Sequence, residues 1–287
     1  MHRVGLALST ALIAVVAIAG APSTGGADEP RAETAKTTLK VVRGPAVQVE
    51  AITDQEDLFD VYEDGFVNCG EGRTPLAPAW SGAPVLVSSA DPDLGTFGTY
   101  SIDIRRPRSS GRVRPAAICA KGPVRATTKH KASGTVSCGK KLAIGVPVSS
   151  SSPFAESPVE SRPVGRNRWK NTDADSMTSA ICVSRRAFRR VQTLKRSKSF
   201  KLGQPSVAVK VTCRGPRRPI GWGYALPLMA QNEAIFPGIT NKRSVPFVSA
   251  STPAGKKAWK VVFRTADELG AKTAAKVTAY VTCAKPA

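Results

Sequence analysis

Six cysteines constrain this 287-residue chain more than any other feature, because they alternate between two kinds of sequence environment. Three of them, the openers, follow a valine by two positions and precede a glycine-containing or basic turn and then a short apolar run. The other three, the closers, end segments with the residue pattern of a strand. The openers are Cys69, Cys138 and Cys213, and the closers are Cys119, Cys182 and Cys283. Their strict alternation predicts three tandem units, each framed by one opener and one closer.

The residues before the cysteines alternate with the period of a β-strand. Val207, Val209 and Val211 share one face with Cys213, and the residues before the last closer repeat this pattern. Pro and Gly, at 22 and 24 residues, are spread through the chain, and no long segment keeps a 3.6-residue apolar period. The sequence therefore predicts an all-β fold of three tandem disulfide-stapled β units, packed into one sandwich- or prism-like body.

An export signal opens the chain. A short basic start precedes an apolar stretch from Val4 to Gly20, and small residues follow, which is the pattern of a secretory signal peptide. We expect cleavage after Ala27, with Ala19 as the alternative. An uncleaved anchor is disfavoured because the stretch is at or below the length of a spanning helix. The chain is therefore predicted to be secreted and extracellular, and not to span a membrane.

Disulfides are the expected state of six cysteines in an exported chain, and no CxxC motif points to a metal or redox site. Pairing each opener with the closer of its own unit predicts Cys69–Cys119, Cys138–Cys182 and Cys213–Cys283. We favour this set because units this small bury too little core to be stable without a staple. A next-neighbour set stays open, with the pairs Cys119–Cys138, Cys182–Cys213 and Cys69–Cys283.

The predicted organisation has five parts. They are the signal peptide (1–27), a polar leader (28–39), β unit 1 with an acidic segment (40–119), β unit 2 (120–182), and β unit 3 with a basic connection (183–287). Within unit 2, the serine run at 149–152 is predicted to be a loop.

The repeated pattern resembles the repeats of secreted actinobacterial proteins of uncharacterised function. That pattern is V-x-C, a Gly or basic turn, an apolar run with glycine, a mid-unit Trp and a final A-Y-x-x-C-A. Unit 3 matches best, with Trp259 and the segment 279–284, and unit 2 keeps Trp169. Unit 1 departs from it, with Ala77-Pro78-Ala79 in place of the glycines. The resemblance covers about residues 65 to 287 and implies a secreted β-repeat protein without catalytic residues to carry over.

Charge is distributed unevenly. Arg3 contributes one unit of the net charge of +21. Residues 28–103 hold 5 basic and 14 acidic residues, a balance of −9, and residues 104–287 hold 36 basic and 7 acidic residues, a balance of +29. A basic surface of this kind attracts polyanions through steering and counterion release. The alternative is that the charge only keeps a secreted protein soluble.

The densest basic run, residues 185–198, bridges units 2 and 3 and is the predicted anion-binding site. Phe188 within it suits stacking or cation–π contact, although a lone Phe in a strand also suits the core. No recognised nucleic-acid motif occurs, so sequence-specific nucleic-acid recognition is not expected. The predicted anion-binding residues are Arg185, Arg186, Arg189, Arg190, Lys195, Arg196 and Lys198, together with Arg105, Arg106 and Arg108.

Catalytic motifs are missing from the sequence. His130 is the one histidine left after cleavage, and neither a G-x-S-x-G elbow nor an H-E-x-x-H motif occurs. No cofactor or metal is predicted, since the acids at 60–64 and 91–93 do not fit the spacing of a calcium loop. The leading prediction is a non-catalytic protein that binds an anionic polymer or surface: envelope glycan, teichoic acid, anionic lipid or extracellular nucleic acid. The alternatives are a structural or inhibitor-type interaction module, and a cell-wall or glycan hydrolase using the acids of 54–64.

Overall fold

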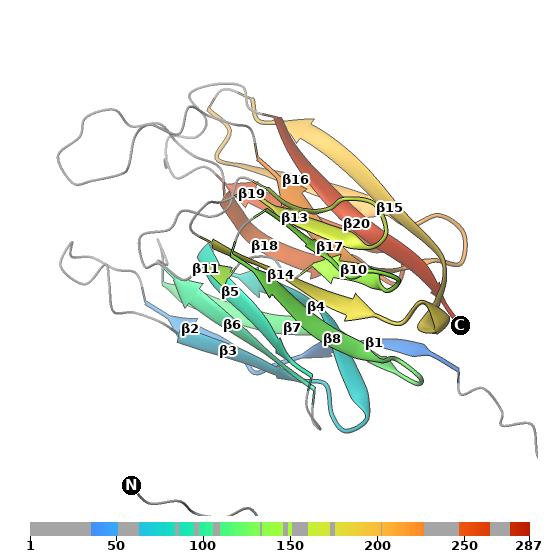
Figure 1. The fold of residues 1–287 in the computed structure, drawn as a ribbon. Helices are drawn as coiled ribbons and strands as arrows, with labels where there is room; N and C mark the ends of the chain where they lie inside the picture. The colour runs from blue at the N-terminus through green and yellow to red at the C-terminus, as the bar shows by residue number, and fades with distance from the viewer. Residues whose placement is uncertain are drawn as a thin grey trace, which may run out of the picture. The chain divides into compact units, whose positions relative to one another are not determined.

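β-Strands account for nearly all of the regular structure, as the sequence predicts (Figure 1). The structure is a computed structural model that describes residues 36–50, 63–83, 86–94, 98–105, 110–132, 134–145, 149–150, 160–172, 176–201, 203–226, 247–264 and 276–287. These residues include one 3-10 turn, η2 (Arg185–Ala187), and no α-helix. Residues 35–287 form one structural unit. The signal peptide predicted at 1–27 lies outside the described residues.

The first sheet combines strands of units 1 and 3. Its order is β1-β7-β4-β18-β19-β16, and β2 continues the line of β1 beside β7. β1 begins at Thr38, inside the segment predicted to be the polar leader. The strands are β1 (Thr38–Arg43), β2 (Val47–Val49), β4 (Arg73–Gly82), β7 (Gly111–Lys121), β16 (Ser206–Thr212), β18 (Phe247–Pro253) and β19 (Ala258–Arg264).

The second sheet combines strands of units 2 and 1 in the order β10-β14-β11-β5-β6-β3, with β8 also beside β14. The strands are β3 (Glu63–Asn68), β5 (Leu86–Asp93), β6 (Thr99–Arg105), β8 (Ala126–Lys131), β10 (Leu142–Gly145), β11 (Ser149–Ser150) and β14 (Ser176–Val183). β10 and β11 both pair with β14. The loop predicted for 149–152 is therefore wrong for Ser149 and Ser150, which lie in a strand that bridges β14 and β5.

The third sheet combines strands of units 3 and 2 in the order β15-β20-β17-β12-β13-β9. The strands are β9 (Gly134–Ser137), β12 (Glu160–Pro163), β13 (Arg168–Asn171), β15 (Phe188–Ser199), β17 (Arg218–Ala225) and β20 (Lys276–Pro286). β15 forms one edge of this sheet, so the densest basic run of the sequence lies on an edge strand.

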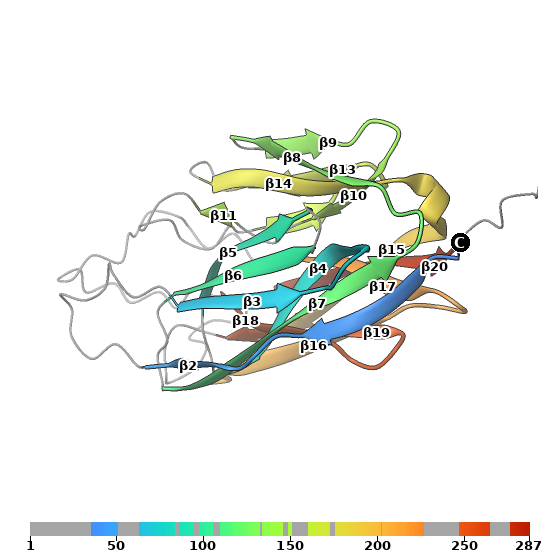
Figure 2. The same ribbon diagram turned by 90° about the horizontal axis from the view of Figure 1, so that it is seen from below.

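One strand plan recurs in all three units, and every sheet is shared by two units. Each opener strand pairs with the strand after the mid-unit turn, as β3 with β6, β9 with β13 and β16 with β19. Each closer strand pairs with the strand of the apolar run, as β7 with β4, β14 with β10 and β20 with β17. Figure 2 shows the two layers of unit 1, with β3 alongside β7 of the first sheet. The three units and three sheets therefore close into a cycle.

The disulfides join the two layers within each unit. They connect Cys69 to Cys119, Cys138 to Cys182 and Cys213 to Cys283, which is the within-unit set. All six cysteines are buried and in phase with the apolar face of their strands. Disulfides of this kind are typical of proteins from oxidising compartments.

Trp169 and Trp259 occupy equivalent places in units 2 and 3. Both rings are fully buried. Trp169 Nε1 donates to Ser161 Oγ at 3.0 Å, and Trp259 Nε1 donates to Ser251 Oγ at 2.7 Å. Both units thus carry the repeat S-x-P-x-G-(R/K)-x-x-W, which the sequence predictions above do not include. In unit 1 the corresponding position, opposite the opener valine, is held by Tyr100.

Tryptophans also connect unit 3 to unit 1 in the core. Trp222 of β17 donates its indole N–H to the carbonyl oxygen of Pro78 in β4 at 2.8 Å. The Trp222 ring lies edge-on to Trp80, with 5.5 Å between the ring centroids, and stacks on Trp259 at 6.2 Å. This packing between units 1 and 3 fixes the position of β17 against the first sheet.

Candidate anion-binding site

The predicted basic run begins in η2 and continues along β15. Ser184 caps η2, because its Oγ accepts a hydrogen bond from the backbone N–H of Arg186. Arg185 and Arg186 are exposed, whereas Phe188 is only 3% exposed. Phe188 therefore packs in the core and does not offer the stacking surface that the sequence suggested.

Strand alternation divides the rest of the run between two faces. Arg196 lies opposite Ala279, and its guanidinium donates to the carbonyl oxygen of Lys210 in β16 at 3.4 Å. Lys198, two residues on, shares the face of Arg196, whereas Lys195 lies on the other face. The structure thus does not bring Lys195, Arg196 and Lys198 to one face.

A bulge separates the first part of β15 from the remainder. Pairing with β20 is interrupted between Arg189 and Gln192, and Arg190 has φ of 51°, in the left-handed region that non-glycine residues rarely adopt. Arg217 Nε donates to the carbonyl oxygen of Arg190 at 2.8 Å, and its Nη1 donates to that of Arg214 at 3.5 Å. The bulge therefore brings the β16–β17 turn, which carries two further arginines, against β15.

These contacts assemble a cluster that we call the basic corner. Its members are exposed or partly exposed cations from three segments that meet beside the Cys213–Cys283 disulfide. Lys285 joins it because it lies directly opposite Arg189. The basic corner consists of Arg185, Arg186, Arg189, Arg190, Arg214, Arg217 and Lys285.

Four residues of the basic corner were predicted from the sequence and three were missed. A signal for the missed ones was present, since Arg214 follows Cys213 and Lys285 comes two residues after Cys283. Pairing those two cysteines already implies that both cations lie near each other. The segments that supply the corner, 176–232 and 276–287, contain no Asp or Glu.

The remaining predicted residues lie elsewhere. Arg105 ends β6, which belongs to the second sheet, whereas β15 belongs to the third. Arg106 and Arg108 lie outside the described residues, as does the acidic segment up to residue 62. Glu63 and Asp64 begin β3, in the second sheet. Only the part of the prediction centred on residues 185–190 thus forms a described cluster.

His130 has a hydrogen-bond partner across β8 and β14. Its Nδ1 lies 2.8 Å from the hydroxyl of Ser179, which is 3% exposed. In a Ser-His-Asp triad the serine faces Nε2, and Nδ1 faces the carboxylate. This pair therefore has the geometry of a cross-strand hydrogen bond, and the non-catalytic character of the protein stays a prediction.

Two other features that would indicate a function are absent from the described part of the chain. It holds no group of three or more His, Cys, Asp or Glu side chains placed to bind a metal. It also contains no helix with the length and apolarity needed to cross a bilayer. Comparison of the chain with protein-family models and with curated proteins finds no match.

Proposed function

We propose that this chain is a secreted, non-catalytic protein that binds an anionic polymer or surface through the basic corner. The observation that carries the proposal is the assembly of seven cations from acid-free segments at one place in the fold. Cations gathered without acidic neighbours raise the local positive potential and release counterions when a polyanion binds. Secretion is supported by the signal-like residues 1–27 and by the three disulfides.

Backbone bonds give the basic corner a defined shape. Arg217 is tied to the carbonyl oxygens of Arg190 and Arg214, so two segments of the cluster are held together independently of any ligand. A cluster ordered in advance loses less conformational entropy when it binds than a flexible basic tail does. This supports binding by a fixed surface that contacts several anionic groups at once.

A salt titration tests the proposal. Binding to polyphosphate and to double-stranded DNA, as generic polyanions, should weaken steeply with rising salt. Replacing Arg185, Arg186, Arg189 and Arg190 together by Gln should reduce the slope of log affinity against log salt by roughly one for each phosphate that the variant no longer neutralises. Affinity should be measured by fluorescence anisotropy at several salt concentrations.

A charge-matched variant provides the control. Lys129, Lys131, Lys140 and Lys141 belong to unit 2, and changing them to Gln lowers the net charge by the same four units. This control should keep most of the salt slope. Equal reduction in both variants would mean that net charge alone attracts the polymer, and an unchanged slope in the first variant would exclude the basic corner.

A further inference from the structure

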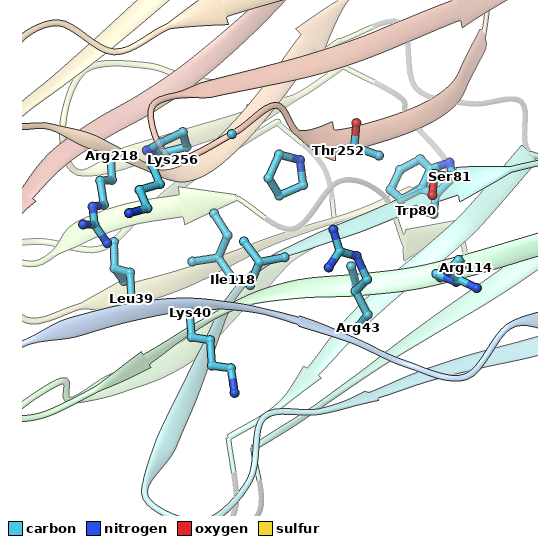
Figure 3. A pocket seen from close by; sticks show the side chains of 15 residues that line it. Leu39, Lys40, Arg43, Trp80, Ser81, Arg114, Ile118, Arg218, Thr252 and Lys256 are labelled. Atoms are coloured by element: carbon cyan, nitrogen blue, oxygen red, sulfur yellow. The ribbon is translucent and has the colours of Figure 1, made fainter.

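A cleft of about 440 Å³ lies on the first sheet, on the face opposite the Cys69–Cys119 disulfide (Figure 3). Cross-strand pairing sets its floor, because residues directly opposite each other project to the same face. Arg43 of β1 lies opposite Ala116 of β7, and Ser81 of β4 lies opposite Arg114. The cleft is therefore built on units 1 and 3, since β18 and the start of β17 form its other wall.

The lining of the cleft combines cations with apolar surface. Its apolar part includes Leu39, Ile118 and Pro253. Among the lining residues that the structure describes, none is acidic and five are basic: Lys40, Arg43, Arg114, Arg218 and Lys256. In Figure 3, Lys40 extends away from the cleft, Arg218 and Lys256 stand together at one end, and Arg43 stands on the other side of Ile118 from them. Four cations thus surround an apolar floor.

A rigid turn holds Lys256 in place. The S-x-P-x-G repeat puts Gly255 at φ of 78° just before it, and the backbone N–H of Ala254 donates to the carbonyl oxygen of Ala258 at 2.8 Å. The equivalent turn of unit 2 has Gly165 at φ of 77° and the same backbone bond, from Val164 to Arg168. The wall of the cleft is thus a repeated structural element with a lysine at its tip.

The third sheet has a place equivalent to the cleft, and larger side chains occupy it. Three residues before the closer cysteine stands Tyr280 in unit 3, where unit 1 has Ala116. The guanidinium of Arg162 lies 5.8 Å from the centre of the Tyr280 ring. Its counterpart in the repeat, one residue after the serine, is Thr252 beside the cleft.

The third sheet also has an acidic residue at a position where the first sheet has none. Glu160 of β12 forms ion pairs with Arg162 and with Lys170, the latter at 2.6 Å. The residue equivalent to Glu160 in unit 3 is Ala250, so the first sheet has no acid at this position. Glu160 thus neutralises Arg162 and Lys170 within the protein, whereas no described lining residue supplies a negative charge at the cleft.

We propose that this cleft binds an amphiphilic anion, that is, one acidic headgroup, phosphate or carboxylate, on an apolar body. Arg218 and Lys256 hold the headgroup at one end of the cleft, because guanidinium and ammonium groups form charge-assisted hydrogen bonds with phosphate and carboxylate oxygens, and Arg43 adds positive charge on the other side of Ile118. Ile118, Leu39 and Pro253 contact the apolar body. The volume lies within the range of small-molecule sites. This site is distinct from the basic corner, although Arg218 adjoins Arg217 in the chain.

Isothermal titration calorimetry with dodecyl phosphate below its micelle concentration tests the proposal. One saturable site is expected. Inorganic phosphate and the neutral detergent dodecyl maltoside should each bind at least about tenfold more weakly. Titration with dodecanoate shows whether the cleft accepts a carboxylate headgroup as well as a phosphate headgroup. Equal binding of the neutral detergent, equal binding of inorganic phosphate, or no saturable site would overturn the proposal.

Two variants assign the site. Ala116→Tyr copies the residue of the third sheet, fills the cleft without changing the charge, and should weaken dodecyl phosphate binding at least about tenfold. The triple change Arg43→Gln, Arg218→Gln and Lys256→Gln alters two exposed residues and one partly exposed residue and leaves the core unchanged, so it remains informative if Ala116→Tyr does not fold. Binding by either folded variant with the affinity of the unaltered protein would refute the assignment.

The basic-corner variant separates this inference from the proposed function. Replacing Arg185, Arg186, Arg189 and Arg190 by Gln should leave dodecyl phosphate binding unchanged while it reduces polyanion binding. The cleft variants should bind dodecyl phosphate more weakly and leave polyanion binding unchanged. If the unaltered protein binds dodecyl phosphate but neither polyphosphate nor DNA, the proposed function is wrong and the proposal for the cleft is retained. If the corner variant loses dodecyl phosphate binding as well, the cleft is not the site.

Discussion

Two sheet faces share one strand plan but differ in chemistry. One is the face of the first sheet that carries Ala116, and the other is the face of the third sheet that carries Tyr280. In the third, Tyr280 fills the space and Glu160 pairs with the cations around it. In the first, Ala116 leaves a cleft whose described lining residues include cations and no acid. The cysteines, the tryptophans and the turn glycines recur in both places. Repetition in this fold thus builds the scaffold, and the outward side chains between the repeated positions decide what each face can do.

Removing a repeated tryptophan should have the largest effect on stability, and its effect on ligand binding should differ between the two faces. Trp259 supports the turn beside the cleft, and Trp169 supports the equivalent turn of unit 2. Changing either one to Ala should lower the free energy of unfolding by about 3 to 5 kcal/mol, measured by denaturant titration. Only Trp259→Ala should also weaken dodecyl phosphate binding, because only its turn carries a cleft lysine.

Ser251→Ala is the milder companion of Trp259→Ala. It removes the acceptor of the Trp259 indole N–H but keeps the ring, so the expected decrease in the free energy of unfolding is about 1 to 3 kcal/mol. Equal stability of Trp259→Ala and the unaltered protein would contradict the assigned role of the repeated Trp–Ser pair.

Replacing the large side chains around Tyr280 should create a second cleft on the third sheet. The triple change Tyr280→Ala, Arg162→Thr and Glu160→Ala installs the residues found at the cleft of the first sheet, where Ala116, Thr252 and Ala250 hold these positions. Calorimetry should then show two dodecyl phosphate molecules bound per chain instead of one, and stability should fall by about 1 to 2 kcal/mol from reduced apolar burial. An unchanged stoichiometry would mean that these three positions do not explain the difference between the faces.

The smallest effect is expected from the charge of Glu160. Burial raises the pKa of its carboxyl, but hydrogen bonds and ion pairs with Lys170 and Arg162 outweigh burial and hold the pKa below its usual value. A lowered pKa in the folded state contributes stability above the ordinary glutamate pKa of about 4.3, and this is lost as the pH falls through the lower folded value. Glu160→Gln should therefore cost at most about 1 kcal/mol at pH 7 and remove that part of the acid sensitivity.

Thermal unfolding from about pH 2.5 to about pH 7, a range that brackets the ordinary glutamate pKa, measures this contribution. Glu71→Gln serves as the control, since Glu71 is an exposed glutamate in the turn after Cys69. The stability difference between Glu160→Gln and the unaltered protein should shrink at low pH, whereas the control should differ little throughout. A difference that grows as the pH falls would contradict the direction given for the Glu160 pKa.

Much of the scaffold follows from local pattern. Val207, Val209 and Val211 are buried in phase with Cys213, as their alternation predicts. The basic corner was partly predictable for the same local reason, since its arginines at 185–190 adjoin one another in sequence. The repeat of Ser161 and Ser251 with their tryptophans was also readable, because in units 2 and 3 alike the tryptophan stands eight positions after the serine.

The cleft was not predictable in this way. Leu39, Trp80, Ile118 and Lys256 belong to β1, β4, β7 and the β18–β19 turn, and none of their local patterns differs from that of an ordinary strand or turn. Arg43 looks like any exposed cation until its opposite neighbour is known to be Ala116. A site whose lining comes from several separate elements has no signature in any one of them.

The sequence by itself determined which face is buried in the strands that lead to Cys213 and Cys283, and it favoured the cysteine pairing of each unit. Only the tertiary structure decided that unit 1 and unit 3 share a sheet, and thereby that Ala116 and Thr252 border one cleft. The physical reason is that side-chain alternation specifies a buried face, whereas the backbone N–H and C=O groups along a strand edge are the same for every sequence. Partner choice between strands therefore depends on how the whole set of cores packs together.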